Sequence, residues 1–176
     1  MFPDSVIAQG LEMKRTKCTE IAKNLGTCMT NDLFEKLKSN LFSIIIDEST
    51  DVTASKFLTI IVKYFDFKNC TIKTRMLDLI DIYEGNAENV GSSGEVLFKK
   101  LIEILEAHQI PLSNFIGFAA DGASNVMGAF DSLSSRLKET LPGITIFKCI
   151  CHSINLCSSE AAKTLPRQCE DFIRNV

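Results

Sequence analysis

The chain has 176 residues, 45% of them hydrophobic, with a formal net charge of -3 and a pI of about 5.5. This composition favours one folded domain and excludes a disordered chain. The acidic balance argues against a surface that binds polyphosphate throughout, although it leaves room for a local basic groove. No apolar run is long enough to span a bilayer, and the first ten residues lack the features of a signal peptide. Seven cysteines without a repeating framework predict a reducing intracellular compartment, with mostly free thiols and several of them buried.

Two helices are predicted before the first strand. Apolar residues at helical spacing indicate a helix over residues 5–25, which Gly26 is expected to end. A shorter helix is expected over residues 32–40, with Asn31 as its cap. The first helix has a basic face that could contact DNA phosphates, although a solvated face is the simpler interpretation. The basic residues are Lys14, Arg15, Lys17 and Lys23.

The stretch FSIIIDESTD, residues 42–51, is the most informative one. Three successive isoleucines are followed at once by Asp47 and Glu48. Such a short β-branched run predicts a strand over residues 41–47 that is buried on both faces. A carboxylate at the end of a buried strand is costly unless a metal ion or a partner charge meets it.

The rest of the chain predicts two further strands and then an alternation of helix and strand. A hairpin that turns at Lys68 and Asn69 joins the second and third strands, the third with an irregular pattern. A capping box from Ser92 to Glu95 starts the next helix, which Pro111 closes. The expected elements are strands over residues 57–66, 71–83, 114–120 and 144–149, a helix up to about Lys138 that Ser124 and Asn125 cap, and a last helix that begins near His152. This order predicts an α/β, ribonuclease H-like mixed five-stranded sheet, three antiparallel strands then alternating helix and strand, with flanking helices.

Two aspartates follow strands that this fold makes neighbours. Asp47 ends the first strand, and Asp121 ends the fourth. In the ribonuclease H-like order these strands run parallel, so their C-terminal ends lie side by side. Two carboxylates there can share divalent metal ions, which place water and stabilise the leaving oxygen of a phosphodiester. The alternative is that each aspartate only caps the following turn or element.

Three stretches are informative together: SIIIDESTD (43–51), GFAADGASNVMG (117–128) and CICHSINL (149–156). They resemble the transposase domain of the hAT superfamily of DNA transposons, and they are most similar to transposon-derived animal proteins that carry this domain beside a BED-type zinc finger. The resemblance extends from about Thr16 to the end of the chain. It implies an N-terminal helical segment over residues 1–40, a ribonuclease H-like core over 41–150, and the incomplete start of a helical insertion over 151–176.

The resemblance also implies a site. That family carries an Asp-Asp-Glu triad, and Asp47 and Asp121 match its two aspartates, as ligands of Mg²⁺ or Mn²⁺. Cys149 and His152 match a Cys-x-x-His motif near the active site, whose histidine is taken to help handle the DNA. The family's glutamate lies beyond the insertion, so the third carboxylate is expected to be absent here. Glu160 could substitute for it, although a solvated surface charge is the simpler expectation.

Two functions from different classes are compatible with these residues. The first is a fragment of a hAT-type transposase, or of a protein derived from one, whose full-length ancestor cleaves and joins DNA with metal ions; the fragment itself is expected to be inactive. The resemblance implies transposon-end DNA as the partner and the nucleus as the location. It also implies possible homo-oligomers, because assembly is common in the family. The second is a domesticated, non-catalytic module that binds DNA or protein.

Further metal sites are weaker hypotheses. A zinc site could use a tight group of residues near the C-terminus, but a structural zinc site needs two ligand pairs, and Cys149 at a strand end is expected to be a packed thiol. The group is Cys149, Cys151, His152 and Cys157. Glu48 and Asp51 are secondary candidates for the divalent site, with a solvated turn as the simpler interpretation.

Overall fold

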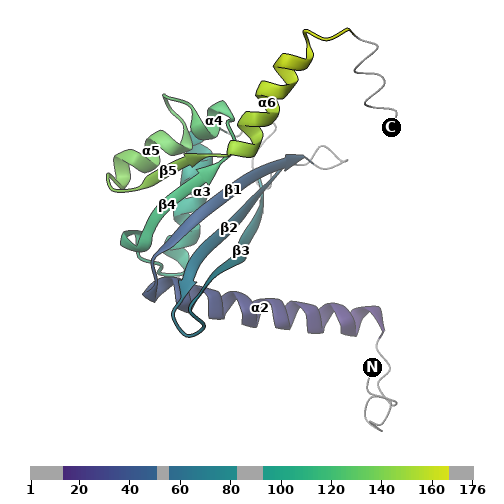
Figure 1. Ribbon diagram of the computed structural model, residues 1–176. Coiled ribbons are helices and arrows are strands. Elements are labelled where there is room, and N and C mark those ends of the chain that lie inside the picture. The colour runs from purple at the N-terminus through teal and green to yellow at the C-terminus, as the bar shows by residue number, and fades with distance from the viewer. Residues whose placement is uncertain (1–13, 51–55, 83–92, 167–176) are drawn as a thin grey trace.

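Five strands form a single mixed sheet in the order β3-β2-β1-β4-β5. The computed structural model describes residues 14–50, 56–82 and 93–166. The strands are β1 (Phe42–Thr50), β2 (Lys56–Asp66), β3 (Thr71–Asp81), β4 (Phe115–Ala120) and β5 (Thr145–Lys148). The central strand β1 is antiparallel to β2 and parallel to β4, and β5 continues the parallel half of the sheet (Figure 1). This topology confirms the predicted ribonuclease H-like α/β fold.

Helices pack on one face of the sheet and extend from its ends. They are α2 (Arg15–Ser39), α3 (Gly94–Ala107), the 3₁₀ turn η1 (Leu112–Asn114), α4 (Ser124–Met127), α5 (Leu133–Thr140) and α6 (Ile150–Ala162). Figure 1 shows α3 and α5 behind the sheet, whereas α6 and the first part of α2 extend away from it. The apolar side chains of α3 and α5 join those of β1, β2 and β4 in one hydrophobic core.

The central strand is buried on one face, not on both as predicted. Phe42, Ile44 and Ile46 are buried against the helices, whereas Ile45 is half-buried and Asp47 is exposed. Successive side chains of a strand point to opposite faces, and α3 and α5 cover only one of them. The strand also continues to Thr50, three residues beyond the predicted end, so Asp47 lies within β1.

The two predicted N-terminal helices are one continuous helix, so the prediction that Gly26 ends the first of them is wrong. A glycine ends a helix when its backbone turns left-handed, and Gly26 instead keeps a helical backbone in α2. The buried residues of α2, which are Leu33, Phe34 and Leu37, all lie near its C-terminal end. Residues 5–13 of the predicted helix lie outside the described residues.

The helix predicted after Asp121 is divided into α4 and α5. A Cβ atom on Gly128 would lie 2.3 Å from the carbonyl oxygen of Ser124, so only glycine fits where α4 ends. Asp131 has a positive φ of 49°, and Ser132 then begins α5 with a capping box to Ser135. These local turns stop the helix despite its apolar spacing.

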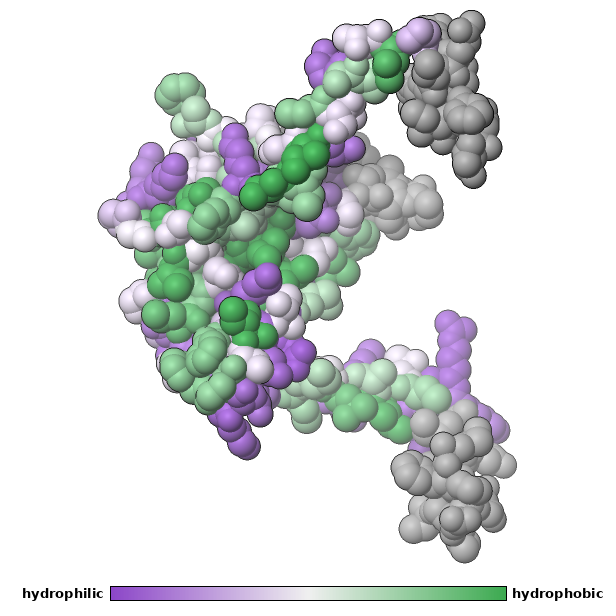
Figure 2. Space-filling view, viewed as in Figure 1, coloured by the Kyte–Doolittle hydropathy of each residue, from purple (hydrophilic) through white to green (hydrophobic). Residues whose placement is uncertain are grey.

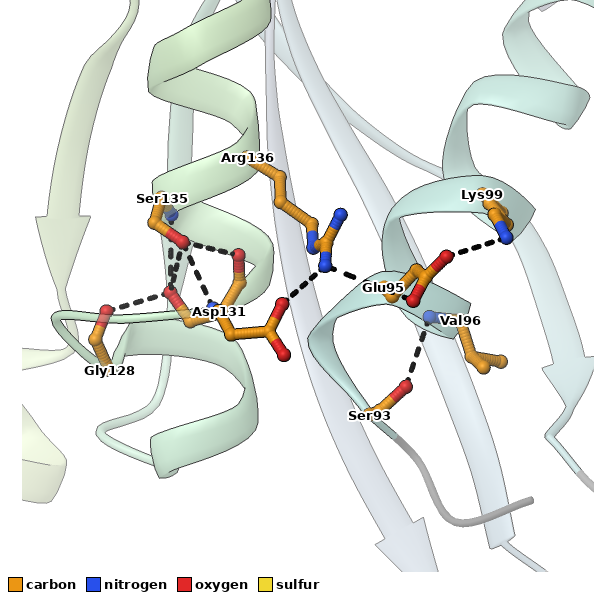
Figure 3. Close-up of polar contacts among 9 residues, drawn as sticks. Ser93, Glu95, Val96, Lys99, Gly128, Asp131, Ser135 and Arg136 are labelled. Carbon is orange, nitrogen blue, oxygen red and sulfur yellow. Dashed lines mark hydrogen bonds and ion pairs between the residues drawn. The ribbon is translucent and has the colours of Figure 1, made fainter.

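An arginine links the N-terminal ends of α3 and α5. Arg136 of α5 pairs with Asp131 and lies 3.9 Å from the carboxylate of Glu95, which also pairs with Lys99 at 2.7 Å (Figure 3). The N-cap of α3 is Ser93, one residue after the predicted cap. Its hydroxyl oxygen accepts a hydrogen bond from the backbone N–H of Val96. Ser92 lies outside the described residues.

Other boundaries agree closely with expectation. The β2–β3 hairpin is antiparallel, and its predicted irregularity appears as a register shift between Ile60 and Ile61. The last helix begins at Ile150, two residues before His152. In the described ranges, no helix is long and apolar enough to cross a membrane. The cysteines of these ranges are free, as predicted, but all are exposed, so the prediction of several buried thiols is wrong for them.

Candidate functional site

The register of β1 and β4 brings Asp47 and Asp121 to the same end of the sheet, where the C-terminal ends of these two strands lie. The last paired positions of the two parallel strands are Ile45 and Ala119. Asp47 and Asp121 each lie two residues further along. Asp47 is still within β1, on the face opposite α3 and α5, whereas Asp121 lies in the turn directly after β4. Two carboxylates 74 positions apart in the sequence therefore reach neighbouring positions, while their role as metal ligands stays a prediction.

The carboxylate of Asp121 is held in a turn. Its Oδ1 atom accepts a hydrogen bond of 3.1 Å from the backbone N–H of Ala123. This is the local bond that aspartate makes at the start of a turn, and it orients the half-buried side chain. Asp121 therefore acts as a turn residue, as the alternative interpretation predicted. This hydrogen bond uses only Oδ1, so the second carboxylate oxygen is left as a potential ligand.

The Cys-x-x-His motif lies at the same end of the sheet. The backbone N–H of Cys149 donates a 2.8 Å hydrogen bond to the carbonyl of Ala120, immediately before Asp121. In the first turn of α6, the ring of His152 approaches Gly122: a Cβ atom added to Gly122 would lie 3.6 Å from the Cδ2 atom of His152. His152 is half-buried there. The Cys149 thiol is exposed, so the expected packed thiol is wrong, because β5 is a short edge strand.

Glu48 and Asn125 form a contact that the sequence did not reveal. The amide of Asn125 donates a 3.3 Å hydrogen bond to Glu48, and Lys56 of β2 pairs with the other oxygen of this carboxylate at 2.9 Å. Only 18% of the Glu48 side chain is exposed. The predictions of a solvated turn for Glu48 and of a cap for Ser124 and Asn125 are therefore wrong. The signal available was the alternation of β1, which directs Glu48 to the face opposite Asp47.

The donor atoms of the aspartate pair match a hard divalent cation. Mg²⁺ takes oxygen ligands and is commonly held by one or two carboxylates together with waters and substrate phosphates. Asp47 and Asp121 supply donors of this kind. Among residues 14–50, 56–82 and 93–166, however, no group of three or more His, Cys, Asp or Glu side chains could hold a metal ion. The proposed zinc ligands around Cys149 and His152 form no such group either.

The remaining acidic candidates do not join the pair. Glu160 is exposed on α6 and forms an ion pair with Lys163, which agrees with a solvated surface charge. Asp51 lies outside the described residues. The four basic residues singled out in the sequence, Lys14, Arg15, Lys17 and Lys23, are exposed, as their simpler interpretation predicted.

A comparison with protein families identifies the chain. The model of the ZMYM1/FAM200 RNase-like domain family (DUF4371) matches residues 6–132, which is more than half of the chain. The match contains both aspartates, whereas Cys149 and His152 lie beyond it. Together with the ribonuclease H-like sheet, it supports an origin in transposase-derived proteins. The chain therefore belongs to the ZMYM1/FAM200 RNase-like domain family, as a transposase-derived RNase-like domain.

Proposed function

We propose that this chain forms part of the ribonuclease H-like core of a hAT-type transposase, or of a nuclear protein derived from one, and that its site acts on DNA. The observation that supports this most directly is the register of β1 and β4, whose last pair, Ile45 and Ala119, lies two residues before Asp47 and Asp121. The position of His152 beside the turn after Asp121 adds a second group of the expected kind. The third carboxylate of the family comes from outside these residues.

Each residue has a distinct role in this proposal. Asp47 and Asp121 would hold Mg²⁺ or Mn²⁺, which when bound activates a water molecule or hydroxyl group and stabilises the leaving oxygen of a phosphodiester. The bond from the Ala123 N–H keeps the Asp121 side chain in one orientation. His152 would contact a DNA phosphate, and the backbone bond of Cys149 to Ala120 fixes the start of the helix that carries it.

A second candidate function is a non-catalytic module that binds DNA or protein. One observation favours it: within the described ranges, no three potential ligands converge. An aspartate pair that binds metal weakly would then persist without catalysis. The two functions differ in metal binding, which can be measured without any activity.

Calorimetric titration of the chain with Mn²⁺ tests the metal site. We expect weak binding that becomes about tenfold weaker in Asp47→Asn and in Asp121→Asn, because each loses one anionic ligand. Asp78→Asn is the matched control, since Asp78 is an exposed aspartate of β3, away from the pair. Equal binding by all four proteins, or none by any, would favour the non-catalytic module.

A cleavage assay tests the incomplete site separately. Incubation of the chain with Mg²⁺ and transposon-end DNA should give no cleavage, because two carboxylates do not complete the triad. Robust cleavage by these 176 residues that is lost in Asp47→Asn would overturn the inference that the third ligand lies elsewhere.

A further inference from the structure

The first part of α2 buries no side chain in the described part of the chain. Every side chain from Arg15 to Met29 is exposed, and the buried residues of the helix begin at Leu33. Figure 1 shows this part of α2 extending away from the sheet. About four helical turns that bury no side chain are marginal in water, and Gly26 lowers the helix propensity further. Packing of one face against a partner would stabilise this segment.

An apolar stripe follows one side of the extended segment. Cys18, Ile21, Leu25 and Cys28 recur at intervals of three and four residues, which places them on one helix face. Ile21 is 38% exposed and Leu25 is 60% exposed, large fractions for aliphatic side chains. Figure 2 shows hydrophobic side chains along this projecting helix. The spacing is that of a helix that packs along another helix.

Charged residues extend the stripe at both ends, and they make it complementary to itself. Lys14, the N-cap residue of α2, lies one turn before Cys18, and Asp32 lies one turn after Cys28. We define the α2 stripe as Lys14, Cys18, Ile21, Leu25, Cys28 and Asp32. When a second stripe runs in the opposite direction, its anion lies opposite the first stripe's cation. Its thiols then lie opposite thiols, and its aliphatic groups opposite aliphatic groups.

We propose that a second copy of this chain packs its α2 stripe antiparallel against the first. A two-fold axis then crosses the interface at the level of residue 23 along the helix. It pairs Ile21 with Leu25, Cys18 with Cys28 and Lys14 with Asp32, and each pair occurs twice. A parallel pair would instead place Lys14 against Lys14 and Asp32 against Asp32, which is repulsive. The charges of Lys14 and Asp32 therefore select both the partner and its direction.

The existing contacts of the charged residues are compatible with this pairing. Asp32 already binds Lys36 at 2.7 Å, but its side chain is 66% exposed and a carboxylate can accept further bonds. The first turn of α2 contains no acidic residue, although its helix dipole favours one. Asp32 of a second copy would supply that negative charge. Lys23 lies on the opposite side of the helix from the stripe and stays free of the interface.

Cysteine cross-linking tests the direction. Cys18 and Cys28 of one helix are about 15 Å apart, too far for an internal disulfide. After mild oxidation of the full chain, we expect a covalent dimer in which the tryptic peptide CTEIAK is joined to NLGTCMTNDLFEK. Cys18→Ser alone and Cys28→Ser alone should each abolish this cross-link. The double variant measures the background from the other cysteines.

The alternative results are distinct. A parallel pair would join CTEIAK to itself and would keep a cross-link in each single variant, which contradicts the proposed direction. A wild-type chain that stays monomeric at high concentration, including one whose α2 binds DNA instead, would overturn the proposal itself.

Sedimentation equilibrium tests the contacts without oxidation. Leu25→Asp should weaken self-association by about tenfold or more, because it places a charge in the middle of the apolar layers. The matched control Lys23→Asp, on the opposite side of the helix, should leave it unchanged. Lys14→Asp and Asp32→Lys should each weaken the dimer, and the double variant should recover it, because the charge pair is then reversed. A double variant that self-associates as weakly as each single variant would contradict the Lys14–Asp32 contact.

Discussion

The amide of Asn125 donates a hydrogen bond of 3.3 Å to the carboxylate of Glu48, across 77 positions of the sequence. Glu48 directly follows Asp47 in β1, and Asn125 belongs to α4, directly after the turn of Asp121. Lys56 of β2 pairs with the same carboxylate at 2.9 Å. This contact connects the two segments that carry the aspartates, so it helps to set their relative position.

Replacement of Glu48 tests the strength of this connection. Glu48→Ala should lower the free energy of unfolding by about 1–2 kcal/mol, because Asn125 and Lys56 lose a mostly buried acceptor. The ion pair adds little to this figure, since the Lys56 side chain is 33% exposed. Glu48→Gln keeps an acceptor and should cost less. The measurement is urea unfolding, with Glu35→Ala, which removes an exposed surface pair, as the control. Equal effects of Glu48→Ala and Glu35→Ala would contradict a structural role for Glu48.

Phe118 and Ile116 of β4 should respond differently to truncation, because Ile116 lies where the register of β4 with β1 shifts. Phe118 is 0% exposed and packs in the core, whereas Ile116 is 47% exposed. Phe118→Ala should lower the free energy of unfolding by about 3–5 kcal/mol through lost burial and a new cavity. Ile116→Ala should cost less than about 1 kcal/mol. Thermal or urea unfolding of both variants checks the orientation of the strand, which would be wrong if Ile116→Ala were the more damaging change.

Two glycines should react in opposite ways to alanine. A Cβ atom on Gly94 would lie 2.4 Å from the carbonyl oxygen of Asp131, so Gly94→Ala should cost about 1–3 kcal/mol by forcing α3 and α5 apart. No atom lies within 4 Å of a Cβ atom on Gly26. Gly26→Ala should therefore raise the helix content of α2 and stabilise it by up to about 1 kcal/mol. Circular dichroism during thermal unfolding measures both effects, and a destabilised Gly26→Ala would contradict the continuous α2.

The Glu95 carboxylate predicts a weak dependence of stability on pH. The hydrogen bond from Lys99, with the nearby charges of Lys99 and Arg136, lowers the pKa of Glu95 from its usual value of 4.5 (Figure 3). Because the folded state favours the ionised form, the contribution is fully present above pH 4.5 and is lost as the pH falls through the lowered pKa. Glu95→Gln should lack this acid-dependent part.

Urea unfolding of wild type and Glu95→Gln between neutral pH and about pH 3 measures the difference. The stability advantage of the wild type should shrink towards the acidic end, and salt should reduce it at neutral pH, since the group is exposed to solvent. An advantage that grows as the pH falls would have the wrong sign for this contact.

The sequence alone determined the order of the elements and placed Asp47 and Asp121 near the C-terminal ends of two neighbouring parallel strands. These features depend on local patterns, such as the isoleucines before Asp47 and the apolar run before Asp121, and on general rules of strand connection. The helix starts were predicted less accurately. Neighbouring serines offer equivalent caps to a sequence pattern, and only the structure selected Ser93 for α3.

Only the tertiary structure decided which face of β1 is buried, whether Gly26 interrupts α2, and where Glu48 and Asn125 point. The buried face of β1 and the directions of Glu48 and Asn125 depend on residues distant in the sequence. The helices α3 and α5 cover one side of β1, and Asn125 reaches Glu48 only because β1 and β4 are adjacent. Periodicity within a strand shows that its two faces differ, but the elements packed against it determine which face is buried.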